Sequence, residues 1–252
     1  MTALHCAAQR GFARVAALLI QHGAAVGLET LDGLGPIHLA AYNGYFDIVS
    51  LLFESKANIL RADGSGNTAL HFAACGDHID IIRYLLEKGS DLEATDCKKR
   101  TPLLSAAMCG KKREGNSRRM LKNKVRINNS VEEGATPLHL AAKSGNIRFV
   151  RTLLDRGADI NAFTPGRLQP LHLAVLGGHT EVVAYLLDKG AEVDTVGCED
   201  LTPLQMVARK GTPIMARVLV ARGARNRKTT QSTPLGLACG HGHLEVVKAI
   251  IE

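Results

Sequence analysis

The stretch Thr136–Ala162, TPLHLAAKSGNIRFVRTLLDRGADINA, determines the fold. Its first two residues favour a helix start, because a threonine hydroxyl can accept an unpaired backbone N–H and proline fits the first helical position. Gly145 is placed to end a first short helix. Apolar residues at three- and four-residue spacing then predict a second helix, which Gly157 closes. The stretch therefore predicts two short helices joined by a tight turn and followed by an extended loop.

The first four residues of this stretch, Thr136-Pro-Leu-His139, recur with variations along the whole chain. We call this four-residue motif, which begins each first helix, the capping word. Eight copies begin near residues 2, 35, 68, 101, 136, 169, 202 and 233, with spacings of 33, 33, 33, 35, 33, 33 and 31. A period near 33 indicates a repeat protein, in which one helical pair cannot bury its own apolar face and stacks on its neighbours. We therefore expect one array over residues 1–252, with the architecture of an all-α repeat solenoid.

The repeated word and the stretch Thr136–Ala162 resemble the ankyrin repeat, whose consensus the stretch follows almost position for position. The resemblance covers essentially the whole chain, and a period of 33 makes it specific. It implies an ankyrin-type helix-turn-helix stack with β-turn finger loops along one edge. It also implies binding of other proteins through the finger tips and the concave face of the first helices.

The repeat at 101–135 is degenerate. It begins with a regular capping word, but the apolar stripe of its second helix is reduced to Met120, Leu121 and Val125. Gly115 and its neighbour Asn116 disfavour a continuous helix there. We expect poor packing in this repeat and partial separation of the array into residues 1–100 and 130–252.

The first and last repeats are expected to be incomplete. The chain opens directly at a capping threonine and stops inside the second helix of its eighth repeat, so we expect a fragment of a longer protein or array. Several apolar side chains at the two ends are then expected to be only half covered: Leu4, Val15, Val246, Val247, Ile250 and Ile251.

Composition indicates a folded chain with an aliphatic core. Hydrophobic residues make up 46% of the sequence and aromatic residues 4%, and no run approaches the roughly 20 apolar residues that cross a bilayer. Six cysteines without a CxxC pair favour free thiols in a reducing, intracellular compartment, either cytoplasmic or nuclear. Four of them are expected to be buried fillers in first helices: Cys6, Cys75, Cys109 and Cys239.

The histidines follow the repeat, which argues against chemistry. Five share the fourth position of the capping word: His5, His38, His71, His139 and His172. Adjacent copies should lie about 10 Å apart, too far to share a metal ion, so we expect hydrogen bonds across the turn or to the next loop. The sequence also lacks a phosphate-binding glycine loop, a GxSxG motif and an HExxH motif. We therefore expect no enzyme, no metal and no cofactor.

Basic residues are concentrated in two regions, although the net charge is only +7. Residues 98–126 hold eleven Lys or Arg and one acid, and residues 209–228 hold seven and no acid. Three interpretations of the first region stay open: a solvated insertion, a docking site for an acidic partner, and a bipartite nuclear-import signal at Lys99–Arg100 and Lys111–Arg113. Few aromatic residues accompany these charges, which makes nucleic acid the less favoured partner.

Function is therefore expected on the surface that varies between copies. The predicted partner-binding residues lie on finger tips, on the first helices or in the degenerate repeat: Gln9, Arg10, Asp32, Tyr42, Asn43, Lys98, Arg100, Lys111, Lys112, Lys143, Arg167, Glu199, Arg209 and Lys210. We expect a monomeric scaffold or adaptor that binds proteins. The alternatives are a recruiting or regulatory arm of a larger protein and, less favoured, polyanion binding through repeats four and seven.

Overall fold

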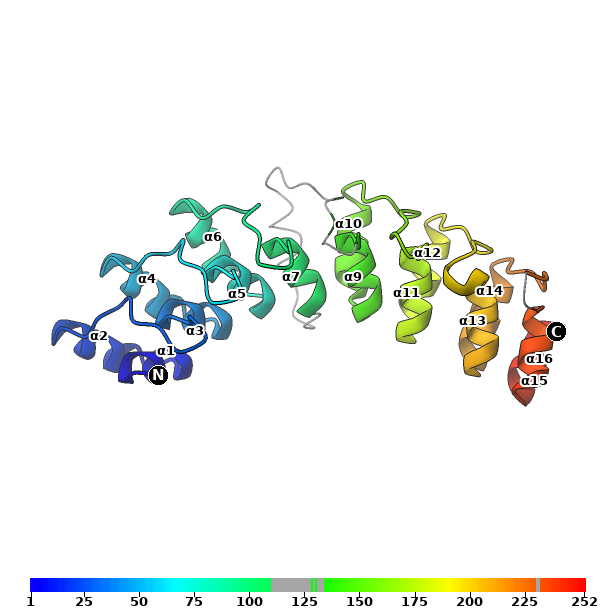
Figure 1. Cartoon of the computed structure of the whole chain (residues 1–252), viewed down its shortest axis with the longest axis horizontal. Coiled ribbons are helices and arrows are strands. Elements are labelled where there is room, and N and C mark those ends of the chain that lie inside the picture. The colour runs from blue at the N-terminus through cyan, green and yellow to red at the C-terminus, as the bar shows by residue number, and fades with distance from the viewer. Residues whose placement is uncertain (110–127, 129, 131–133, 230–231) are drawn as a thin grey trace. The chain divides into compact units, whose positions relative to one another are not determined.

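The computed structural model describes residues 1–109, 128, 130, 134–229 and 232–252. Within this part it contains helices and turns, one isolated bridge between Ala62 and Thr68, and no strand. The chain divides into two compact units, Met1–Arg126 (unit 1) and Ile127–Glu252 (unit 2), and each is a row of helical pairs (Figure 1). The predicted all-α repeat architecture is confirmed. The repeat boundaries as one array stay a prediction.

The helices follow the repeat. Those of unit 1 are α1 (Ala3–Arg10), α2 (Ala13–Gln21), α3 (Pro36–Asn43), α4 (Phe46–Glu54), α5 (Ala69–Gly76), α6 (Ile79–Glu87) and α7 (Pro102–Cys109). Those of unit 2 are α9 (Pro137–Ser144), α10 (Ile147–Leu154), α11 (Pro170–Gly177), α12 (Thr180–Asp188), α13 (Pro203–Lys210), α14 (Pro213–Ala221), α15 (Pro234–Gly240) and α16 (Leu244–Ile251), with a short 3-10 turn η1 (Cys198–Asp200). The second helix expected in the repeat at 101–135, together with Lys111 and Lys112, lies outside the described residues.

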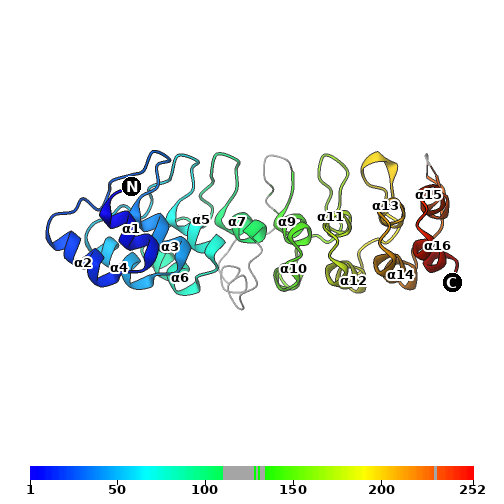
Figure 2. The same cartoon turned by 90° about the horizontal axis from the view of Figure 1, so that it is seen from below.

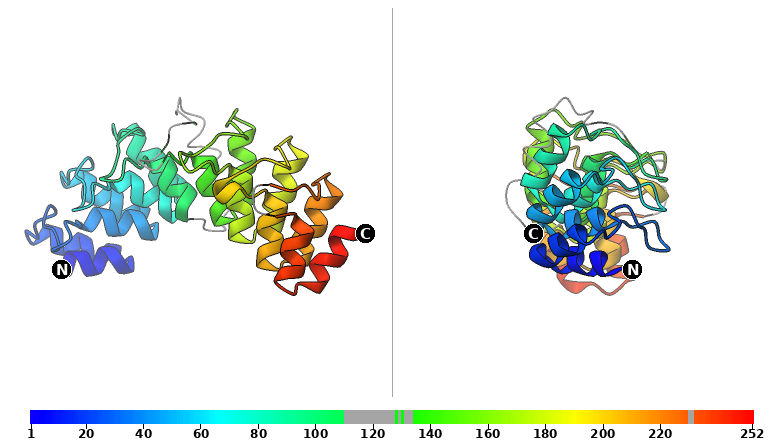
Figure 3. Two further views of the ribbon diagram at one scale, coloured as in Figure 1. Left: turned by 45° about the vertical axis from the view of Figure 1, so that its right-hand side comes forward. Right: turned by 90° about the vertical axis from the view of Figure 1, so that its left-hand side faces the viewer.

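Within each unit the first helix of every pair lies between the finger loops and the second helices (Figure 2). Neighbouring fingers in unit 1 also bond to each other: Gly64 N donates to Asp32 O and Cys97 N donates to Ser65 O, both over 2.9 Å. The hairpins of a unit stack in sequence order (Figure 3). Each repeat therefore leaves a finger and one side of its first helix open to solvent.

Two kinds of cap begin the first helices. Where the fourth residue of the capping word is not histidine, the threonine hydroxyl accepts its amide, as Thr101 Oγ1 does from Leu104 N (3.4 Å) and Thr233 Oγ1 from Gly236 N (3.0 Å). Where it is histidine, the ring Nδ1 accepts the N–H of the capping residue instead, as His139 does from Thr136 (3.2 Å). Both arrangements satisfy a donor that a helix start would leave unpaired.

In four repeats, the left-handed glycine after the first helix admits a ring from the next repeat: Gly11, Gly44, Gly145 and Gly211. Gly44 has φ 86°, and a Cβ built there would lie 2.3 Å from the ring of His78. Glycine thus serves both the backbone conformation and the close approach at this position. Asp77 takes the same place in the third repeat at φ 65°, a conformation that Asp adopts more readily than most residues.

The core is aliphatic, as the composition predicts, and it runs between the helical layers. Its largest fully buried side chains are Leu4, Ile48, Leu52, Leu70, Ile81, Leu85, Leu103, Leu104, Leu138, Phe149 and Leu153. The expectation of half-covered ends is wrong for Leu4 and Val246, which are 2% and 1% exposed because their own hairpins and neighbours enclose them. It is confirmed for Val15, which is 48% exposed.

Candidate partner-binding surface

An apolar groove of about 200 Å³ lies in unit 1, between first helices and two fingers. We call it the unit 1 groove and define it by its lining residues: Tyr42, Asn67, His71, Phe72, Cys75, Arg100, Ser105, Met108 and Cys109. Tyr42 comes from α3, Phe72 from α5 and Met108 from α7, so three successive repeats build it. Tyr42 and Met108 remain 37% and 44% exposed, which leaves apolar surface for a partner.

Aromatic contacts fix the floor of the groove. The ring of Phe72 lies 5.4 Å from that of His38 and 6.4 Å from that of Tyr42, the latter edge to face. Edge-to-face pairs at such distances are favourable beyond the area they bury. The helices thus hold Tyr42 in place before any partner arrives.

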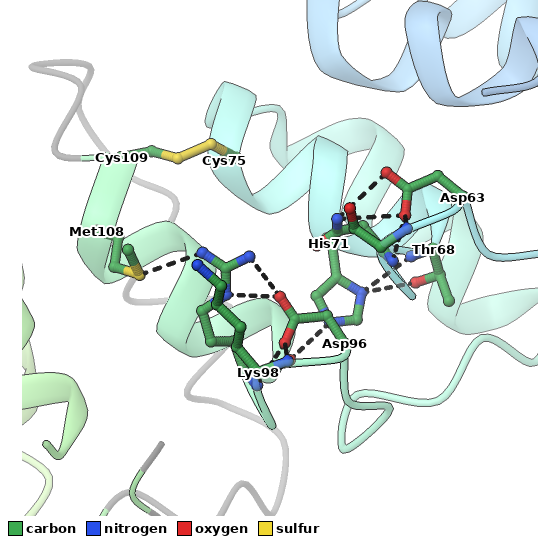
Figure 4. Close-up of polar contacts among 11 residues, drawn as sticks. Asp63, Thr68, His71, Cys75, Asp96, Lys98, Met108 and Cys109 are labelled. Carbon is green, nitrogen blue, oxygen red and sulfur yellow. Dashed lines mark hydrogen bonds and ion pairs between the residues drawn. A yellow bond between two sulfur atoms is a disulfide. The ribbon is translucent and has the colours of Figure 1, made fainter. Parts of the chain in front are cut away.

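Arg100 forms a wall of this groove and is not the free finger tip that its sequence position suggests. Its Nε and Nη2 each lie 2.5 Å from Oδ2 of Asp96, and only 23% of its side chain is exposed. Nη1 points to Met108 Sδ at 3.7 Å (Figure 4). Lys98, two residues earlier on the same finger, is exposed.

Asp96 organises that finger. Its side chain is buried, and Oδ1 accepts the backbone N–H groups of Lys98 (2.9 Å) and Arg100 (2.8 Å). Burial opposes ionisation of Asp96, but these amides and the Arg100 guanidinium outweigh it and hold the carboxyl pKa below its ordinary value. Asp63 holds the preceding finger in the same way, accepting from Ser65 N (3.0 Å) and Asn67 N (2.7 Å).

The remaining predicted residues of unit 1 are exposed. Gln9 and Arg10 end α1, and Asn43 ends α3 with its Nδ2 bonded to Leu39 O of the same helix (2.9 Å). Asp32 lies on the first finger, where its backbone oxygen accepts the bond from the next finger. None of these four lines the unit 1 groove.

The predicted residues of unit 2 form a surface of mixed charge. Arg209 Nη1 lies 2.5 Å from Glu199 Oε2, which joins α13 to a finger tip. Arg167 Nη1 lies 3.8 Å from Asp200 Oδ1 on the neighbouring finger. Lys143 is exposed on α9. Because each of the two arginines faces a carboxylate, this face is less basic than the sequence suggests.

The histidines of the capping word are structural, as predicted. The Nε2 of each lies within hydrogen-bond distance of a carbonyl oxygen in the following finger, for example His71 with Arg100 O (2.9 Å) and His172 with Thr195 O (3.3 Å). Since Nδ1 accepts, Nε2 carries the proton and the ring is neutral. Burial lowers the pKa of His38, His71 and His139, and it lowers that of His172 to about 4.

A second set of histidines links each repeat to the one before it. In each case Nε2 lies 2.9 to 3.3 Å from a carbonyl oxygen at the end of the preceding first helix; the residues are His78, His179 and His243. Such terminal carbonyls have no partner within their own helix. Both sets therefore join repeats, and no three His, Cys, Asp or Glu side chains of the described residues are arranged to hold a metal ion.

The prediction of six free cysteines is wrong for two of them. Cys75 and Cys109 form a disulfide between α5 and α7 (Figure 4). Buried packing is also wrong for Cys6 and Cys239, which are exposed because they lie on α1 and α15, whose repeats have a neighbouring repeat on one side only. The compartment inferred from free thiols stays a prediction. No helix within the described ranges is both long and apolar enough to cross a membrane.

Two groove residues, Cys75 and Met108, were missed at the sequence level although a signal existed. The rule that selected Tyr42, seven residues after a capping position, also selects Cys75 in the third repeat and Met108 in the fourth. Phe72 carries no such signal, because leucine or methionine fills its position in five other repeats, as in a packing position: Leu39, Leu140, Leu173, Met206 and Leu237.

Comparison with known proteins agrees with this geometry. Family models described as ankyrin repeats match residues 90–164, 113–197 and 171–252, a further one matches 37–86, and a single ankyrin repeat matches 1–30. A similar solved structure, the crystal structure of the human ASB11 ankyrin repeat domain, is 24% identical with a TM-score of 0.56, covering 99% of this chain and 98% of that one. This likeness shows the fold. No curated protein matches the sequence. Ankyrin repeats are generally protein–protein interaction modules. The chain belongs to the ankyrin repeat family.

Proposed function

We propose that the chain is a non-catalytic scaffold or adaptor that binds a segment of a partner protein across its fingers and first helices, with the unit 1 groove as the main contact. One observation carries this proposal: Tyr42 and Met108 stay exposed around a concave, apolar site, while the repeated packing positions are buried. Partly exposed aromatic side chains held in place at the centre of a concave patch are typical of binding hot spots.

The groove and its rim define the partner's chemistry. An apolar side chain of the partner would fill the space between Tyr42, Phe72 and Met108. Arg100 offers little charge, because Asp96 already pairs with it. Lys98 is exposed on the same finger, so acidic residues flanking the apolar one would meet a positive charge there. The partner is thus a segment with an apolar anchor and neighbouring carboxylates.

Selection of binding peptides tests the proposal. A random peptide display library is selected on the whole chain, and the Kd of each selected peptide is measured by calorimetry. We expect apolar residues flanked by Asp or Glu, and Kd values raised about tenfold or more by Tyr42→Ala or Met108→Ala. Ile214→Ala is the matched control, since Ile214 is 70% exposed on a second helix. Peptides that bind both groove variants as tightly as the wild type would contradict the proposed site.

Charge is tested separately. Lys98→Glu should weaken the same peptides several-fold, and less at high salt, because the side chain lies on the rim. A peptide affinity that falls steeply with salt and depends on Lys98 but on neither Tyr42 nor Met108 would instead favour the polyanion interpretation.

A further inference from the structure

Cys75 and Cys109 are unlike the other cysteines of the described residues. Their Cα atoms lie 5.3 Å apart on neighbouring first helices, 34 residues apart in sequence, and a disulfide joins them. Such a Cα separation suits a disulfide without movement of the helices. The other four, Cys6, Cys97, Cys198 and Cys239, are free thiols.

The disulfide lies in the wall of the unit 1 groove. Cys75 and Cys109 both line it, and Met108 immediately precedes Cys109 at the end of α7 (Figure 4). Both cysteines are partly exposed residues at the surface of the groove, where a small thiol can approach them. The bond therefore tethers the last turn of α7, which carries Met108, to α5, which carries Phe72.

We propose that Cys75 and Cys109 are a reversible thiol–disulfide switch of this groove, with a low-molecular-weight thiol such as glutathione as the reductant. The oxidised form fixes Met108 beside Phe72, and the reduced form releases the last turn of α7 and weakens binding. The effect on binding rests on the proposed function, whereas the redox step does not.

The redox step is an ordinary exchange. One glutathione thiolate attacks a sulfur of the disulfide, forming a mixed disulfide and expelling the other cysteine as a thiolate. A second glutathione thiolate attacks the glutathione sulfur of that mixed disulfide, forming oxidised glutathione and expelling the second cysteine thiolate. Two electrons pass from two glutathiones to the protein, and each cysteine thiolate takes up the proton that one glutathione lost. Oxidised glutathione drives the reverse reaction.

Thiol trapping tests this step. The whole chain is equilibrated at a series of reduced and oxidised glutathione ratios, quenched in acid and alkylated, and its peptides are analysed by mass spectrometry. Cys75 and Cys109 should lose the alkyl label together in a single two-electron transition as the mixture becomes more oxidising, and a peptide linked through them should appear. Cys75→Ser should leave Cys109 alkylated or carrying glutathione, and Cys6→Ser should not move the transition. Full alkylation of both residues at every ratio, or pairing with another cysteine, would overturn the proposal.

Two further measurements separate this switch from the proposed function. Amide exchange in α7 should be at least about tenfold faster in the reduced chain and in the Cys75→Ser, Cys109→Ser double variant, with α13 unchanged. The selected peptides should bind the oxidised chain at least about fivefold more tightly. Equal α7 exchange or equal Kd in the two redox forms overturns the switch and leaves the binding function standing. If the library yields no peptide on either form, the proposed function fails, and trapping and exchange still decide the redox pair.

Discussion

Lys210 donates a hydrogen bond from Nζ to the backbone oxygen of Leu176, 2.9 Å away in the preceding repeat. His78, His179 and His243 make the equivalent bond in other repeats, each to the last part of the first helix before it. The repeat of Lys210 has Thr212 where those repeats have histidine, so the lysine supplies the missing donor from a different position. Part of the surface predicted to bind partners therefore holds the stack together.

This relationship predicts different roles for two exposed lysines. Lys210→Met should lower the free energy of unfolding by about 0.5 to 1 kcal/mol, since it removes the partner of a helix-end carbonyl. Lys143→Met, on α9, should change it by less than about 0.5 kcal/mol, as surface substitutions usually do. Urea unfolding of both variants measures the difference. Equal stabilities would show that water replaces the lysine without cost.

A second prediction compares Arg100 with Lys98, two basic residues of the third finger in unit 1. Arg100→Ala should destabilise unit 1 by about 2 kcal/mol, because it leaves the buried Asp96 carboxylate without its cation. Lys98→Ala on the same finger should cost less than about 0.5 kcal/mol, since its side chain is exposed. Thermal unfolding compares them, and the Asp96 carboxyl pKa, followed by NMR, should rise in the Arg100 variant alone. A binding loss in an Arg100 variant would therefore not by itself identify a partner contact.

The third prediction concerns Gly44. Gly44→Ala meets two costs, a left-handed backbone at φ 86° and a Cβ within 2.3 Å of the His78 ring. Gly178 has the same role at φ 77° with no atom near its added Cβ, so Gly178→Ala measures the backbone cost alone, about 1 kcal/mol. Gly44→Ala should cost at least about 1 kcal/mol more.

The double variant Gly44→Ala, His78→Ala is the internal check on that reasoning. It removes the ring with which the added Cβ would clash. Its loss of unfolding free energy should therefore be smaller than the sum of the losses in the two single variants. Strict additivity of the two substitutions would mean that the ring moves aside without cost.

The fold could be predicted because the information that specifies it is local and repeated. Capping words and closing glycines determine where helices begin and end, so a single stretch such as Thr136–Ala162 predicts the hairpin, and eight copies predict the stack. The roles of the histidines followed from the same periodicity. Spacing alone shows that copies 33 residues apart occupy equivalent places, which favours equivalent hydrogen bonds over a shared metal ion.

The site could be predicted only in part, because it depends on contacts between repeats. Tyr42 was predicted from its place on α3, but nothing in the sequence shows that Asp96 withdraws Arg100 from the finger tip. Cys75 and Cys109 lie 34 residues apart, and only the stacking of α5 on α7 brings them within bonding distance. A search for short cysteine spacings therefore could not find the pair.

The last prediction is a pH dependence centred on His172. Burial lowers its pKa from 6.5 to about 4 in the folded chain. Between these values the unfolded chain binds more protons than the folded chain, so the free energy of unfolding falls as the pH falls below about 6.5 and levels off below about 4. The shift corresponds to about 3 kcal/mol for this residue alone. His38, His71 and His139, whose pKa values are also lowered, add to the loss in the same direction.

The chain itself supplies the matched variant. Gln205 occupies the histidine position in the seventh repeat, where Oε1 accepts from Thr202 N (2.7 Å) and Nε2 donates to Thr229 Oγ1 (2.8 Å). His172→Gln should therefore keep both kinds of bond without a titrating ring. Urea unfolding from pH 7 to pH 4 should show the variant losing less stability than the wild type, by up to about 3 kcal/mol at pH 4. If the unfolding free energies of the two proteins fell in parallel with pH, His172 would not be the group that takes up the proton on unfolding. A His172 ring that stays neutral in the folded chain must make the wild type more sensitive to acid than the variant.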